Sequence, residues 1–119
     1  MSAKKQEISY NDREIRAFLE NGCEFEGKLQ FSGVVRLNGK FKGEIESNDT
    51  LIIGETAEVE GTLNVGAIII GGKVNGEIHA KHRAEILSTG FVNGNLVSPA
   101  LITHEGAQIV GQFRVKSTK

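Results

Sequence analysis

The sequence has little proline, cysteine or net charge, and each shortage excludes a class of protein. Its 119 residues include one proline, one cysteine and no tryptophan. One cysteine cannot form an intramolecular disulfide, so the composition favours a protein of the reducing cytoplasm. A formal net charge of -1 supplies no long-range field that would attract DNA or an anionic membrane.

Long apolar runs and nucleotide-binding motifs are also missing. No run approaches the ~20 apolar residues that span a bilayer, and the N-terminus lacks the apolar core of a signal peptide. The sequence contains no Gly-x-x-x-x-Gly-Lys-Ser/Thr motif and no Gly-x-Gly-x-x-Gly between a strand and a helix. We therefore expect no catalytic site, no cofactor and no direct binding of nucleic acid.

Glycine, by contrast, is abundant, and it marks a repeat. A five-residue pattern recurs six times: an apolar residue, any residue, glycine, any residue and a second apolar residue. The central glycines are 16, 18, 15, 18 and 17 residues apart. These glycines are Gly27, Gly43, Gly61, Gly76, Gly94 and Gly111. A repeat of this length is too short for a pair of helices and suits one winding of a parallel β-helix.

Alternation within each repeat predicts about three short strands per winding. Around Gly61, the apolar Val59, Leu63 and Val65 point to one side, whereas Glu60 and Thr62 point to the other. The first set is expected to fill the interior and the second to face water. The predicted core includes Val59, Leu63, Val74, Ile78, Val92 and Leu96.

Turn-forming residues separate the windings and account for the unequal spacing of the glycines. Asn38-Gly39 and Gly71-Gly72 predict short corners. Residues 53–57, 87–90 and 104–107 predict longer ones.

The repeat predicts a single all-β domain, a parallel β-helix of about six windings over residues 15–115. Residues 1–14 are expected to form a flexible tail and residues 116–119 a short C-terminal tail. Residues 12–22 also fit a small helix, with Asp12 as its cap. However, residues 18–25 align without a gap with residues 102–109, which favours a strand at 15–19.

The reactive side chains favour structural roles. Cys23 shares a column of small residues with Ala57 and Ala107, so we expect a buried thiol. His79 and His82 are three residues apart beside a strand, where they point to opposite faces and make poor metal ligands together. His104 lies in a corner, and we expect all three histidines to be solvated.

Carboxylates occupy outward positions of the predicted strands. Several of them could stack into ladders along one face, and the neighbouring Lys28, Lys42 and Lys73 could offset the repulsion between like charges. A solvated face is favoured over a metal site. The carboxylates are Glu24, Glu26, Glu44, Glu46, Glu58 and Glu60.

The two ends of the predicted rod should expose unpaired strand edges, and aromatic residues crowd near them. A second chain added at such an end satisfies the edge and buries the aromatic rings, and repeated contacts of this kind build an open filament. The residues expected at this interface are Phe18, Phe25, Phe31, Ile109, Phe113 and Val115. The alternative is a monomer whose tails fold over its ends.

Residues 18–29 and 35–45, with Phe25-Glu26-Gly27-Lys28-Leu29 and Phe41-Lys42-Gly43-Glu44-Ile45, resemble the opening of a bactofilin domain. The similarity extends over about residues 15–115. It implies a right-handed β-helix and a bacterial cytoskeletal scaffold that forms a homopolymer without nucleotide, through its terminal windings. It also implies roles in cell shape, cell-wall synthesis, motility or chromosome organisation. Cell-wall enzymes or chromosome-segregation proteins would then be its partners.

Many members of this family carry an N-terminal membrane-targeting segment. Here Lys4 and Lys5 are the only basic pair in the first ten residues. Each is worth about 1 kcal/mol near an anionic surface, which is too little for a monomer to bind, although a filament repeats the tail many times. The expected location is therefore the cytoplasm, and the inner face of the cytoplasmic membrane remains an alternative.

Two other functions remain open. A left-handed β-helix acyltransferase would have windings in strict multiples of six residues and a long loop presenting a catalytic histidine, and this chain shows neither. A passive binding solenoid, for example one that binds carbohydrate, would carry an outward ladder of aromatic residues. The phenylalanines fall mostly in inward positions, which disfavours that function.

Overall fold

The computed structural model describes residues 7–18 and 22–115, and these form nine strands with no helix. Every pairing between the described strands is parallel, which confirms the predicted parallel β-helix. The strands are β1 (Glu7–Phe18), β2 (Glu24–Leu37), β3 (Lys40–Ser47), β4 (Thr50–Ile53), β5 (Glu58–Ile70), β6 (Lys73–Ile86), β7 (Phe91–Ser98), β8 (Leu101–Thr103) and β9 (Gln108–Val115).

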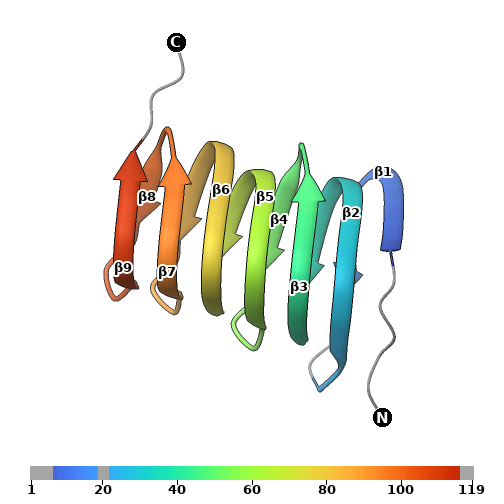
Figure 1. Cartoon of the computed structure of the whole chain (residues 1–119), viewed down its shortest axis with the longest axis horizontal. Coiled ribbons are helices and arrows are strands. Elements are labelled where there is room, and N and C mark those ends of the chain that lie inside the picture. Colours follow the sequence, from blue (N-terminus) through green and yellow to red (C-terminus); the bar gives the residue numbers. More distant parts are fainter. Residues whose placement is uncertain (1–6, 19–21, 116–119) are drawn as a thin grey trace.

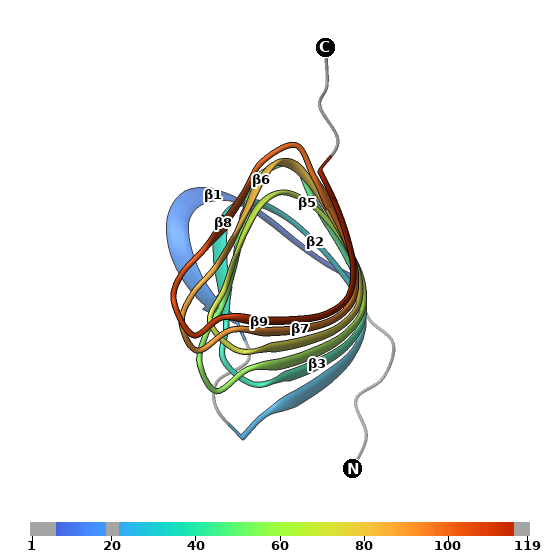
Figure 2. The same cartoon turned by 90° about the vertical axis from the view of Figure 1, so that its left-hand side faces the viewer.

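The strands wind into one coil with a triangular cross-section (Figures 1 and 2). Neighbouring turns follow the order β1-β2-β3-β5-β6-β7-β9, and β4 and β8 complete the turns begun by β3 and β7. The coil has about five turns rather than the six expected, because β1 and β9 each supply only part of a turn. Seen from the C-terminal end, the chain runs anticlockwise as it approaches the viewer, so the coil is right-handed (Figure 2).

A column of glycines forms one corner of the triangle. The register places Gly61 beside Gly43 and Gly76, and the same alignment joins all six glycines of the repeat. Their φ angles lie between +126° and +152°. A Cβ atom on Gly61 would lie 1.8 Å from the carbonyl oxygen of Gly43, so the close approach of successive turns requires glycine here.

The interior of the coil is almost entirely aliphatic. The six side chains predicted for the core have exposed fractions of 2% or less. At the N-terminal side the rings of Phe25 and Phe41 stack with their centroids 5.3 Å apart. Ser98 is also fully buried, and its hydroxyl donates a hydrogen bond to the carbonyl oxygen of Ala100 at 2.7 Å. The core therefore runs without interruption from β2 to β7.

The longer corners share one turn geometry. In residues 54–57 the N–H of Ala57 donates to the carbonyl oxygen of Gly54 at 3.0 Å, and equivalent bonds close residues 87–90 and 104–107 at 2.8 and 3.0 Å. The Thr89 hydroxyl then donates to the carbonyl oxygen of Gly71, in the short corner of the preceding turn, at 2.6 Å. The sequence-based division into short and long corners is confirmed.

The first strand begins earlier than the sequence suggested. β1 starts at Glu7, whereas the sequence analysis placed the first strand at residues 15–19 and a flexible tail at 1–14. Residues 7–11 pair with 28–32, and residues 15–18 pair with 34–37 after a register shift. Residues 7–14 precede the glycine repeat, so the repeat gave no sign that this segment pairs with β2. Lys4, Lys5 and residues 116–119 lie outside the described residues.

Candidate assembly surfaces at the ends of the coil

The C-terminal end of the coil is open. β8 and β9 pair with the preceding turn, and no described strand pairs with their other edge. Leu101, Ala107, Ile109 and Phe113 pack against the core but are only partly buried. Val115, the last described residue, is 57% exposed. Among the described residues, the apolar interior is therefore only partly covered at this end.

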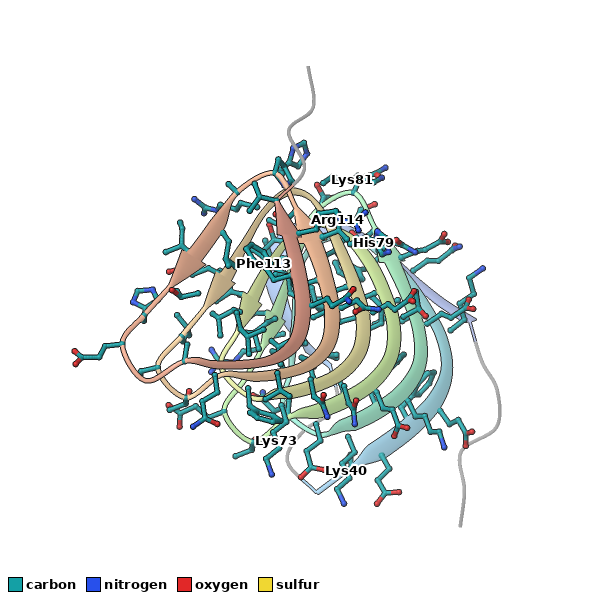
Figure 3. All side chains as sticks on the ribbon, turned by 60° about the vertical axis from the view of Figure 1, so that its left-hand side comes forward. Lys40, Lys73, His79, Lys81, Phe113 and Arg114 are labelled. Atoms are coloured by element: carbon teal, nitrogen blue, oxygen red, sulfur yellow. The ribbon has the colours of Figure 1, made fainter. Side chains whose placement is uncertain are left out.

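Phe113 is exposed because of its position in the coil. It lies beside Leu96, and the same column continues through Ile78 and Leu63, which are each at most 1% exposed. These residues have a turn on both sides, whereas Phe113 has one on a single side among the described residues. Figure 3 shows Phe113 on the inner side of β9, at the end of the coil. A partner placed on this end would cover the ring and supply partners for the edge N–H and C=O groups.

The N-terminal end is different because β1 covers much of it. Phe25 and Phe31 are 8% and 5% exposed, so they belong to the core and do not form an open surface. Phe18 is the last residue of β1 and pairs with Leu37, but its side chain falls outside the described part of the chain. A partner at this end would meet β1 before Phe31, which lies beside Tyr10 in the register.

The six residues proposed for the interface therefore fall into two unlike groups. Ile109, Phe113 and Val115 lie together in β9, whereas the phenylalanines lie in the first turn and in β1. Val110, which is 53% exposed at the C-terminal end, was not among these six residues. The corresponding residues of the earlier turns are charged or polar, so an apolar residue at this outward position was a signal in the sequence.

Cys23 is exposed, which contradicts the prediction of a buried thiol. Its carbonyl oxygen accepts a hydrogen bond from the N–H of Lys40 at 2.9 Å, which places it in the same corner column as Ala57. Ala57 has a turn on each side and is 1% exposed. Cys23 begins the first full turn, so only one described turn covers it.

The histidines show no metal-binding arrangement. His79 and His82 are exposed, and His104 Nε2 lies 2.7 Å from Glu85 Oε2. Among the described residues, no group of three or more His, Cys, Asp or Glu side chains could hold a metal ion.

The six outward carboxylates considered from the sequence do not stack on one another, so they form no ladder. Lys40 lies between Glu24 and Glu58 in the register, and Lys42 lies between Glu26 and Glu60. Glu44 and Glu46 also have no carboxylate beside them in the neighbouring turns. Like charges directly opposite in a sheet are destabilising, and the repeat avoids this cost by alternating the signs.

Comparison with known proteins agrees with this architecture. A family model, Bactofilin, described as polymer-forming cytoskeletal, matches residues 17–114. This chain belongs to the bactofilin family. The bactofilin family is a structural cytoskeletal family and not an enzyme family. The right-handed coil also rules out the left-handed acyltransferase considered from the sequence.

A curated relative supports the family assignment. The chain is 28% identical over 86 residues to Bactofilin BacP of Myxococcus xanthus (strain DK1622). The match covers 72% of this chain and 36% of the relative, so the chain corresponds to about a third of that bactofilin. No solved structure matches the chain. Within the described ranges, no helix has the length and apolar character needed to cross a membrane.

Proposed function

We propose that this protein assembles end to end through its terminal windings into filaments, without nucleotide, and acts as a scaffold that positions other proteins. The open C-terminal turn carries the proposal. There Ile109 and Phe113 are only partly buried, and the outer edge of β9 pairs with no described strand. Membership of a polymer-forming cytoskeletal family supports self-association.

The end contact would be held by apolar burial and backbone hydrogen bonds. Each Å² of apolar surface removed from water contributes about 25 cal/mol, and edge strands pair readily with a strand of another chain. Salt screens interactions between exposed charges, but it does not weaken apolar burial. The proposed end-to-end assembly should therefore persist as the salt concentration rises.

Substitution of Phe113 by arginine tests the contact. An arginine at this position would place an unpaired charge inside the interface, which is costly. We expect Phe113→Arg to keep the β-sheet signal in circular dichroism while filaments shorten to small species in negative-stain electron microscopy. Gln112→Arg is the control, because it adds the same charge at the neighbouring exposed position of β9. Filaments of unchanged length in Phe113→Arg would contradict the proposal.

Location and partners form the finer part of the proposal. The filament would lie in the cytoplasm or at the inner face of the membrane, and would serve cell-wall enzymes or chromosome-segregation proteins. Lys4 and Lys5 would supply the membrane contact, repeated in every subunit of the filament. Filaments mixed with anionic lipid vesicles should float with them in a density gradient, and Lys4→Glu/Lys5→Glu filaments should not. Equal flotation of the two proteins would exclude this contact.

A further inference from the structure

One side of the coil carries its charges in alternating order. This side, called here the charged face, consists of the outward residues that precede the glycine corner in the first four turns. One column is Glu24, Lys40, Glu58 and Lys73, and the other is Glu26, Lys42, Glu60 and Asn75. All eight side chains are exposed. Figure 3 shows Lys40 and Lys73 pointing away from the same side of the coil.

Among the described residues, the charges of this face form no ion pair within 4.0 Å. In the described part of the chain, Lys28 Nζ lies 3.9 Å from Glu46 Oε1 and His104 Nε2 lies 2.7 Å from Glu85 Oε2, and neither contact lies on the charged face. Both columns line a shallow groove of about 350 Å³. The alternating lysines and glutamates therefore remain available to a partner.

We propose that the charged face binds the charged face of a second copy, with the two coils side by side and antiparallel. The two-fold axis lies in the plane of contact, perpendicular to the coil direction, and passes between the turns of Lys40 and Glu58. It reverses the order of the turns in the second copy. Lys40 then faces the Glu58 position of the other coil, and Glu24 faces the Lys73 position. In the other column Lys42 faces the Glu60 position. Every charge that meets another charge meets its opposite.

The same charges disfavour a parallel pair. A two-fold axis along the coil direction would set one column opposite the other, turn by turn. Glu24 would then face Glu26, Lys40 would face Lys42, and Glu58 would face Glu60. Like charges brought together across an interface discriminate against that arrangement. The charge order therefore favours the antiparallel pair over a parallel pair whose turns are in register.

The lateral contact should be weak in a single pair of molecules. An exposed ion pair contributes roughly 0–1 kcal/mol and is screened by salt. A filament repeats this contact in every subunit, which strengthens the pairing of two filaments. The strength of pairing therefore rests on the filament proposed above, whereas the geometry of pairing does not. Lateral pairing should weaken as salt is added, unlike the end contact.

Charge-reversal variants test the surface. Lys40→Glu/Lys73→Glu makes the first column wholly acidic, and Glu24→Lys/Glu58→Lys makes it wholly basic. Each variant, assembled alone at low salt, should give single filaments where the wild type gives paired or bundled ones in electron microscopy. Mixing the two preassembled filaments should restore pairing, because opposite columns then meet. Wild-type bundling by either variant alone would overturn the proposal and leave the face to a different partner.

A matched control keeps the alternation and inverts its sign. The fourfold variant Glu24→Lys/Lys40→Glu/Glu58→Lys/Lys73→Glu retains an opposite charge at every step along the column. It should pair with itself as the wild type does, with an unchanged midpoint of thermal unfolding. Loss of pairing in this variant would show that the individual residues matter and not their order, which would also overturn the proposal.

Cross-linking tests the antiparallel geometry directly. Glu24 and Lys73 are three turns apart in one chain, or about 14 Å, so a zero-length carboxyl-to-amine cross-link between them requires two copies. In a mixture of isotopically light and heavy protein at low salt, mass spectrometry should detect Glu24–Lys73 links that join light to heavy chains. Filaments without these links would refute the lateral pair and leave the proposed function standing. Links without filaments would support the pair and refute end-to-end assembly.

Discussion

At the scale of single residues, the glycine corner is where the fold restricts the choice of amino acid most severely. Gly61 combines a φ of +135° with a carbonyl oxygen 1.8 Å from where a Cβ atom would lie. Gly22 also has a positive φ of +94°, but nothing lies within 4 Å of its Cβ position. A comparison of substitutions at Gly61 and Gly22 therefore separates the cost of a positive φ from the cost of a clash with the neighbouring turn.

Gly61→Ala should therefore destabilise the protein more than Gly22→Ala does. A non-glycine residue at a positive φ costs about 1–3 kcal/mol, and at Gly61 the backbone of the neighbouring turn must also move. Chemical denaturation of the two variants measures the difference. Equal losses of unfolding free energy would show that the close approach of the turns contributes little.

At the scale of the element, a turn in the middle of the coil differs from a turn at its end. Ile78 in β6 is fully buried between two turns, whereas Val115 in β9 is 57% exposed. Both residues point inward in their turns, so the repeat alone does not distinguish them. Their energetic roles differ because only Ile78 is covered from both sides.

Ile78→Ala should lower the free energy of unfolding by about 2–5 kcal/mol, because it removes a fully buried aliphatic group. Val115→Ala should change it by less than about 0.5 kcal/mol, as is usual for exposed positions. Urea denaturation, run at a protein concentration where filaments do not form, measures both. A change near zero for Ile78→Ala would mean that the inward column has been assigned wrongly.

The glycine repeat and the alternating apolar positions were enough to predict the parallel turns, the short and long corners and the inward columns. They predicted a strand at residues 15–19 but not residues 7–14 of β1, which lie outside the repeat. Cys23 was placed in the correct column, but burial also depends on how many turns cover a position. The alternation showed that the carboxylates point outward, but it did not show which residues lie beside them in the neighbouring turns. The register between the strands places lysines between several of these glutamates.

At the scale of the whole molecule, the two ends and the charged face suggest contacts of different physical character. The C-terminal end offers apolar side chains and a free strand edge, whereas the charged face offers alternating exposed charges. The sequence indicated apolar residues at both ends of the coil. It did not show that β1 covers much of the N-terminal end. Salt distinguishes the two contacts, since it screens the charges and leaves apolar burial intact.

Negative-stain electron microscopy of the purified protein without nucleotide, at low and at high salt, would show whether the coils join end to end. We expect filaments in both conditions, with lateral bundles only at low salt, and sedimentation of the same samples should report the same change in assembly size. Dispersed single molecules or closed oligomers in both conditions would contradict end-to-end assembly.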